Sequence, residues 1–166
     1  MTFEQYTEKE NVYKNINGVK FIDCSNKMLT SLKGIEKYKN LIHLVCNNNF
    51  LVKLKGIEKL KNLTHLEVSD NLIKSIEEIK NLKNLIKFVA NNNLITSLKP
   101  LKKLSKLEYI SLCYNHIESL IGLENLTKET DIYLNVIISS NISSFKLIQL
   151  AKLEARKEKI KNLIYK

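Results

Sequence analysis

The stretch LTHLEVSDNLIKSIEEIKNLKN, residues 63–84, contains the pattern on which the chain is built. Its first half reads Leu-x-x-Leu-x-Val and places two apolar residues, Leu66 and Val68, on one face of a short strand. After Asn71 the apolar residues recur at every third position, which favours a tight 3-10 or short helical return over a long helix. The stretch therefore predicts one strand, one corner and one compact return.

The same pattern recurs without insertion at a spacing of 22 residues from Val19 to Lys128, which makes five units. One unit cannot bury its own apolar edge, so neighbouring units have to stack into a curved solenoid. The asparagine at each corner can accept and donate hydrogen bonds to main-chain groups, and stacking aligns these side chains into a ladder. In the first unit Lys27 replaces the asparagine, so we expect a looser turn there. The predicted structural ladder consists of Asn49, Asn71, Asn93 and Asn115.

This pattern resembles the leucine-rich repeat family, and most closely its 22-residue class, which is typified by a regulatory subunit of type-1 protein phosphatase. Axonemal dynein light-chain, tubulin-chaperone, spliceosomal and internalin-type proteins share that class. The resemblance covers residues 19–128 and implies an α/β fold. The implied fold is a right-handed solenoid with a parallel concave sheet, short helical or 3-10 returns, an N-terminal cap and a C-terminal helix. The family is a binding scaffold with many unrelated partners, so the resemblance does not name one.

Both ends of the chain depart from the repeat and are predicted to cap it. Thr2 and Gln5 form the pattern of a capping box for a short helix, which is expected to cover the open end of the first unit. The C-terminal helix should seal the last unit with an apolar stripe of Phe145, Ile148, Leu150, Leu153, Ile160, Leu163 and Ile164. The predicted parts are 1–18, the N-terminal cap; 19–128, the five repeats; 129–144, a degenerate repeat with a shifted frame; and 145–166, a basic helix.

The composition is strongly basic, with 27 Lys and Arg against 17 Asp and Glu and a formal net charge of +10. Much of the lysine lies in the returns, where a solvated convex face is the simpler interpretation and attraction to nucleic acid is the alternative. No run of about 18 apolar residues exists, so we expect no membrane span. The first residues lack a secretory signal pattern, and the three cysteines fit a reducing compartment. We therefore expect a cytoplasmic or nuclear protein.

No catalytic or cofactor motif is present in the sequence. Four glycines, none at the required spacing, exclude a glycine-rich phosphate loop. His43, His65 and Glu67 could together supply three zinc ligands, but two histidines on an exposed sheet are far more common than such a site. We therefore predict a non-catalytic protein without a cofactor or a metal site.

The concave face of the predicted sheet can be written down from the repeat. Parallel strands lie about 4.8 Å apart, so identical positions of the units align in columns. These columns carry aromatic, histidine and branched residues, which interface centres favour; the competing interpretation is that they are merely exposed. A row of Met28, Phe50, Leu72 and Leu94 after the corner is either a second contact strip or packing between turns. The predicted partner-binding residues are Phe21, Asp23, His43, Val45, His65, Glu67, Lys87, Val89, Tyr109 and Ser111.

Two functional hypotheses follow. The leading one is a protein–protein interaction scaffold, monomeric in isolation, that binds another protein through the concave sheet. Phosphatase-regulatory, cytoskeletal and ribonucleoprotein adaptor roles come from the resemblance alone. The alternative is a ribonucleoprotein or ribosome-associated component held electrostatically by its basic C-terminal helix and its lysine-rich convex face, with nucleic acid as the partner. The two hypotheses differ in the surface used and in the dependence of binding on salt.

Overall fold

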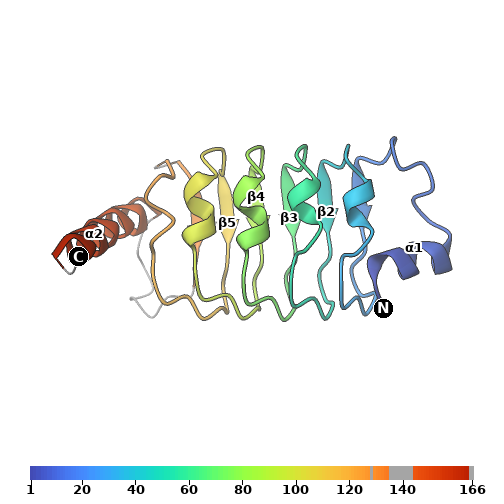
Figure 1. Cartoon of the computed structure of the whole chain (residues 1–166), viewed down its shortest axis with the longest axis horizontal. Coiled ribbons are helices and arrows are strands. Elements are labelled where there is room, and N and C mark those ends of the chain that lie inside the picture. Colours follow the sequence, from blue (N-terminus) through green and yellow to red (C-terminus); the bar gives the residue numbers. More distant parts are fainter. Residues whose placement is uncertain (128, 135–143, 165–166) are drawn as a thin grey trace.

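One parallel sheet of six strands runs along the molecule in chain order (Figure 1). The computed structural model describes residues 1–127, 129–134 and 144–164 and, within the last range, the side chains of 146–158. Identical positions of neighbouring units pair with each other, for example Leu44 with Leu66. The strands are β1 (Phe21–Asp23), β2 (His43–Val45), β3 (His65–Glu67), β4 (Lys87–Val89), β5 (Tyr109–Ser111) and β6 (Asp131–Tyr133).

The returns are short 3-10 helices stacked beside one another in front of the sheet in Figure 1. The apolar residues at every third position turn inward, and Ile73, Ile76 and Ile79 are all buried between the sheet and the returns. The predicted fold class, a parallel-sheet solenoid with 3-10 returns, is confirmed. The returns are η1 (Ile35–Lys37), η2 (Ile57–Lys59), η3 (Glu77–Asn81) and η4 (Lys99–Lys103).

A Gly-x-Glu sequence sets the entry into the first two returns. Gly34 and Gly56 have φ angles of 101° and 107°, which only glycine adopts without strain. The glutamate two residues later accepts a hydrogen bond from the glycine N–H, at 2.9 Å for Glu36 and 2.7 Å for Glu58. The third and fourth units lack this glycine, and their 3-10 helices are five residues long instead of three.

The sixth strand corrects two of our expectations. We expected five strands and a shifted frame in 129–144, but β6 pairs with β5 at the unchanged spacing, with Ile110 opposite Ile132. Ile132 and Leu134 fill the two inward positions of the unit. The Thr130 hydroxyl also donates to the main-chain oxygen of Leu107 at 2.9 Å and ties the sixth unit to the fifth. The repeat therefore continues in frame to residue 134, and the rest of the degenerate unit lies outside the described residues.

The N-terminal helix α1 (Phe3–Glu10) covers the first unit. It begins with the expected capping box, in which the Thr2 hydroxyl accepts from the Gln5 N–H and the Gln5 side chain accepts from the Thr2 N–H. Phe3 and Tyr6 on its inner side are buried in the core.

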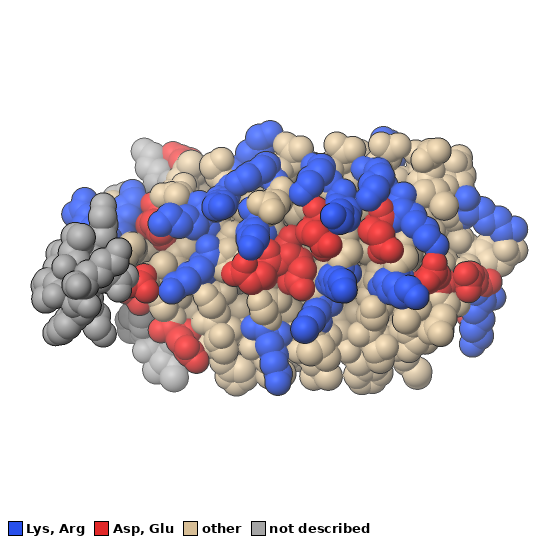
Figure 2. Space-filling view, viewed as in Figure 1, with Lys and Arg blue, Asp and Glu red and all other residues tan. Residues whose placement is uncertain are grey.

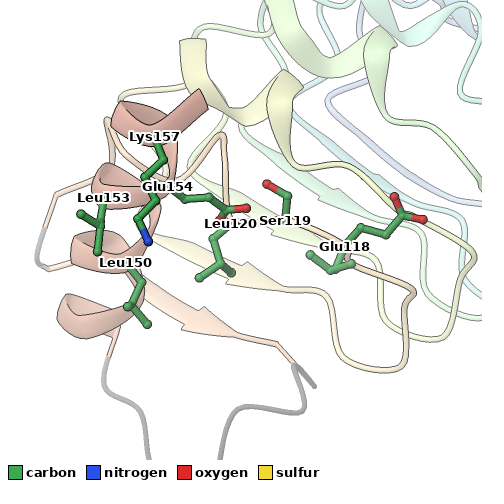
Figure 3. A pocket seen from close by; sticks show the side chains of 8 residues that line it. Glu118, Ser119, Leu120, Leu150, Leu153, Glu154 and Lys157 are labelled. Atoms are coloured by element: carbon green, nitrogen blue, oxygen red, sulfur yellow. Dashed lines mark hydrogen bonds between the residues drawn. The ribbon is translucent and has the colours of Figure 1, made fainter. Parts of the chain in front are cut away.

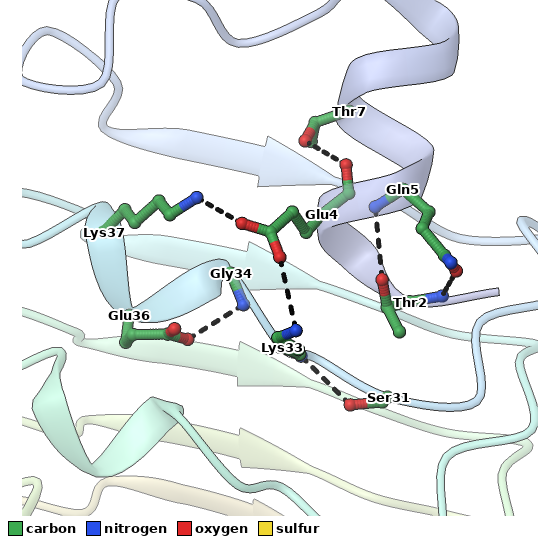
Figure 4. A network of polar contacts seen from close by, with 9 residues as sticks. All are labelled: Thr2, Glu4, Gln5, Thr7, Ser31, Lys33, Gly34, Glu36 and Lys37. Atoms are coloured by element: carbon green, nitrogen blue, oxygen red, sulfur yellow. Dashed lines mark hydrogen bonds and ion pairs between the residues drawn. The ribbon is translucent and has the colours of Figure 1, made fainter.

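Figure 4 shows how α1 is held against the first return. Glu4 forms ion pairs with Lys33 and Lys37. A Cβ atom at Gly34 would lie 2.8 Å from the Cβ of Glu4, so the glycine permits this close approach. The cap is therefore specific to the first unit rather than a loose cover.

A single tyrosine closes the free edge of β1. The Tyr13 hydroxyl donates to the Asp23 main-chain oxygen at 2.8 Å and accepts from the Asp23 N–H at 3.3 Å. Unpaired edge strands recruit other chains, so satisfying both groups with one hydroxyl blocks that route at this position.

The C-terminal helix α2 (Ser144–Ile164) packs beside β6 and beside the fifth return, the irregular segment that contains Leu120. Our predicted apolar stripe is partly wrong, because Leu153 is 49% exposed while Leu147, Ile148 and Ala151 are buried. Residues three and four apart share one helix face, so these three buried residues form the sealing face and Leu153 lies on its flank. The side chains of Phe145, Ile160, Leu163 and Ile164 lie outside the described residues. No helix in the described ranges is long and apolar enough to cross a membrane.

Candidate functional site

The solvent-facing side of the sheet, which we call the sheet face, carries a continuous row of rings and charges. At one end, the rings of Phe21 and His43 meet edge to face with centroids 5.1 Å apart. The ring of His65 lies 4.9 Å beyond that of His43. Further along, the Lys87 ammonium stands 5.7 Å from the centroid of the Tyr109 ring. Register places these five side chains side by side on successive strands.

Glu67 is the electrostatic centre of the sheet face. Its Oε1 accepts from Lys87 Nζ at 2.8 Å and lies 3.7 Å from His43 Nε2, an imidazole atom that has no hydrogen-bond partner among the described residues. His65 Nδ1 shares a hydrogen bond of 2.8 Å with the Thr64 hydroxyl. Burial lowers the pKa of His65, and the neighbouring His43 and Lys87 lower it further. The centre of the row is therefore half-buried, and the charges within it are already paired.

Nine of the ten predicted partner-binding residues lie in two rows that reach solvent. The exception is Ser111, which is only 6% exposed and whose hydroxyl donates to Asn91 Oδ1 at 2.8 Å. Ser111 therefore offers little surface to a partner, because its side chain is buried and its hydroxyl already binds Asn91. Val45 and Val89 are half-exposed and supply the apolar part of the second row.

The four corner asparagines lie in one row beneath the sheet face, and all hold main-chain groups. Asn71 Oδ1 accepts from the Leu51 N–H of the preceding unit at 2.9 Å. Asn49 accepts from two such groups, the N–H of Lys27 and of Leu29. The first turn, where we expected looseness, is therefore bonded twice, and it differs instead by an additional residue of positive φ, Met28.

A second polar ladder, which our sequence reasoning did not recognise, lies between the corner and the sheet face. Each member accepts a hydrogen bond from the main-chain N–H of the next unit, at 2.7 to 3.2 Å. The signal was visible as a serine–asparagine alternation at the repeat spacing. Because these side chains bind the chain itself, only the first two rows of the sheet face remain for a partner. The accepting residues are Ser25, Asn47, Ser69 and Asn91.

The sheet face is acidic although the protein is basic. Over the outward positions of the described strands, three carboxylates stand against one lysine, Lys87, whereas the whole chain has 27 basic and 17 acidic residues. The charge of the sheet face is therefore opposite in sign to that of the rest of the molecule. The three carboxylates are Asp23, Glu67 and Asp131.

Comparison with known families gives a match to "Leucine Rich repeats (2 copies)" over residues 39–81. Residues 39–81 of this chain therefore match leucine-rich repeats. No curated protein matches the sequence.

Two internalin structures from Listeria monocytogenes strain 4b F2365 are similar to this repeat solenoid. An internalin (inlF) matches with a TM-score of 0.64 and 22% identity, over 74% of this chain and 36% of its own length. An internalin C2 (inlC2) matches with a TM-score of 0.57 and 26% identity, over 81% of this chain and 69% of its own length. This chain thus spans about a third of the first internalin, and these similarities support the leucine-rich-repeat fold.

Much of the lysine lies in and beside the returns. Figure 2 shows the face of the returns, where Lys and Arg extend along the molecule on both sides of a central band of Asp and Glu. Lys59 and Lys61 are exposed there, whereas Lys37 is bound to Glu4. Lysine on this face is therefore interrupted by acidic groups rather than gathered into one basic patch.

Two further surfaces flank the leucine-rich repeats. In the row after the corner, Met28, Phe50 and Leu72 are exposed and Leu94 is half-buried, so most of the row reaches solvent. A groove of about 320 Å³ separates α2 from residues 117–120 (Figure 3). Glu154 in this groove accepts from the Leu120 N–H at 3.0 Å. We therefore interpret the groove as the boundary at which α2 packs against the repeats. No group of three potential metal ligands occurs within the described part of the chain.

Proposed function

We propose that this protein is a non-catalytic interaction module that binds a partner protein through the sheet face of its leucine-rich repeats. The observation that carries the proposal is the row from Phe21 to Tyr109, in which rings and charges stand in register on five strands. The two asparagine and serine–asparagine ladders maintain the fold, whereas this row contributes half-exposed aromatic and imidazole surface. Interface cores are enriched in such residues, and a few of them dominate binding energy.

The proposal is tested by a double variant on the sheet face. Partners are first captured from the source cell with the wild-type protein, and their affinity is then measured for His43→Ala combined with Tyr109→Ala. We expect binding to weaken by about 2 kcal/mol or more, with an unchanged circular dichroism spectrum. The matched control is Lys59→Ser combined with Lys61→Ser on the returns, which should leave affinity unchanged. Normal binding by the double variant would refute the proposal.

We further propose that the chain belongs to the 22-residue class of leucine-rich repeats, with a phosphatase-regulatory, cytoskeletal or ribonucleoprotein adaptor role. The unchanged spacing from β1 to β6 supports this class. A cytoplasmic or nuclear location is also proposed, supported by three cysteines that are free thiols. The monomer is the proposed functional form.

A second candidate function is electrostatic attachment to nucleic acid through the returns and α2. The lysines along both margins of the return face favour it (Figure 2). Binding of this kind weakens steeply as salt rises, because neutralised phosphates release counterions. A strong loss of affinity in the lysine control variant, together with a steep salt dependence, would replace the sheet-face proposal with this one.

A further inference from the structure

The two end strands of the sheet differ from the inner four in what they expose. Phe21 and Asp23 in β1 are both exposed, and so are Asp131 and Tyr133 in β6, whereas the corresponding residues of β2 to β4 are half-buried. Among the described residues each end strand pairs with one other strand only, which leaves its outward side chains more accessible. The exposed fractions are 52% for Phe21 and 49% for Tyr133.

Each end strand therefore presents an aromatic ring and a carboxylate two residues apart on the same side of the sheet. We call the pair of Phe21 and Asp23 the first corner, and the pair of Asp131 and Tyr133 the last corner. The last corner is extended by Tyr109, whose ring lies 5.3 Å from that of Tyr133. The same two chemical groups thus occur at both ends of one face.

A carboxylate beside an exposed ring is suited to a guanidinium or ammonium group. The carboxylate pairs with the charge, and the ring face attracts the cation and stacks on a planar guanidinium. The middle of the face cannot serve in this way, because Glu67 is already bound to Lys87 at 2.8 Å. Asp23 Oδ1 accepts only from a main-chain group, the Ser25 N–H at 2.9 Å, so the carboxylates without a charged partner among the described residues of the two rows lie at the two ends.

We propose that the sheet face binds a basic segment of a partner protein and takes one arginine side chain in each corner. This proposal rests on the proposed function and names the chemistry of the partner. Six strands at about 4.8 Å place the corners about 24 Å apart. An extended segment rises about 3.3 Å per residue, so its two arginines are about seven residues apart. The residues between them lie over the rings of His43 and His65 and over the two valines of the second row.

The charge of the sheet face supports this occupant. A net negative face on a chain of formal charge +10 attracts a basic segment and repels nucleic acid. A second copy of this chain also has basic surface, on its returns and α2, and is the competing occupant that the test has to separate.

The probe is a synthetic peptide with two arginines separated by six Gly and Ser residues, titrated into isotope-labelled full-length protein at low salt and followed by NMR. A second peptide of identical composition has its two arginines adjacent. We expect the spaced peptide to shift the amide signals of both corners and to bind about tenfold more tightly than the adjacent one, since only it engages two sites at once. Equal affinity of the two peptides, or shifts at one corner only, would overturn the proposal.

Two double variants test whether the carboxylates of the two corners bind the peptide. Asp23→Asn combined with Asp131→Asn removes one carboxylate from each corner at exposed positions, and we expect the affinity for the spaced peptide to fall at least about tenfold. The control, Glu10→Gln combined with Glu118→Gln, removes the same charge from exposed positions away from the sheet face and should leave affinity nearly unchanged. Equal losses in both variants would overturn the proposal in favour of unspecific attraction.

Two outcomes separate this inference from the proposed function. If the natural partner is lost with His43→Ala and Tyr109→Ala but is retained by the Asp23→Asn and Asp131→Asn variant, the sheet face binds a partner of different chemistry and this inference is wrong. Sedimentation velocity tests the competing occupant. A concentration-dependent dimer that disappears in the Asp23→Asn and Asp131→Asn variant would assign the corners to a second copy of the chain.

Discussion

Asn71→Ala is the sharpest test of how the repeat is held together, because the structure shows which group loses its partner. Asn71 is 6% exposed, and its Oδ1 accepts from the buried Leu51 N–H at 2.9 Å. Its Nδ2 donates to three main-chain oxygens, of Cys46, Val68 and Ser69.

All three oxygens keep another donor when Asn71 is removed. The Cys46 oxygen also accepts from the Asn49 amide, the Val68 oxygen from the Asn93 amide, and the Ser69 oxygen from the Asn48 N–H. The loss of folding free energy therefore comes mainly from one buried N–H, that of Leu51, which is left without an acceptor. Such a group typically costs about 1–3 kcal/mol. Asn49 holds two N–H groups, so Asn49→Ala should destabilise the protein more than Asn71→Ala does.

Urea denaturation followed by circular dichroism measures these differences as shifts of the midpoint at constant slope. The control is Asn81→Ala, an exposed asparagine at the end of η3, which should change the free energy of unfolding by less than about 0.5 kcal/mol. Equal midpoints for Asn71→Ala and Asn81→Ala, or a larger effect of Asn71→Ala than of Asn49→Ala, would refute the reasoning.

The other predictions concern packing, backbone, protonation and the sheet edge. Leu66→Ala empties a fully buried position and should cost about 2–5 kcal/mol in the same denaturation assay. Gly122→Ala should prevent the native fold, seen as loss of a cooperative thermal transition, because φ is 122° and the new Cβ would lie 1.9 Å from a main-chain oxygen. The lowered pKa of His65 means that the fold favours the neutral imidazole, so stability should be complete above about pH 6.5 and should fall below it. A melting temperature with the same pH dependence in His65→Gln would contradict this assignment. Tyr13→Phe removes both hydrogen bonds to the edge strand and should cost about 1 kcal/mol; an unchanged melting temperature would show that the edge is closed in another way.

The buried positions of the repeats could be predicted from the sequence, whereas contacts between neighbouring units and the packing of the chain ends could not. Positions such as Leu66 and Ile110 could be assigned because one 22-residue period with fixed apolar positions allows a single arrangement of strand and return. The burial of Ser111 could not be assigned in this way, since it depends on Asn91 in the neighbouring unit. The Ser–Asn ladder was missed for the same reason, because its members bond laterally and not within their own unit.

For the C-terminal helix, the sequence could not predict which of its faces is buried. The sequence of α2 contains two overlapping faces, one with Leu147 and Ala151 and one with Leu150 and Leu153. Helical periodicity permits either face, and only the position of the fifth return selects the first. The frame of the sixth unit was misjudged because few of its residues repeat the pattern, and its in-register strand depends on pairing with β5.

Each corner asparagine binds the unit that precedes it in the chain, and this order affects when the contacts can form during synthesis. The return of each of the first four units is fastened by an asparagine that lies in the following unit, as Leu51 is by Asn71. At about 5–20 residues per second, a ribosome delivers that asparagine roughly 1–4 seconds later, so each unit leaves the ribosome unfinished. In the fifth unit Glu154 of α2 accepts a hydrogen bond from the Leu120 N–H, so a residue much later in the chain also holds this unit. This bond of the fifth unit can form only after the C-terminal helix has been synthesised, because Glu154 follows Leu120 by 34 residues.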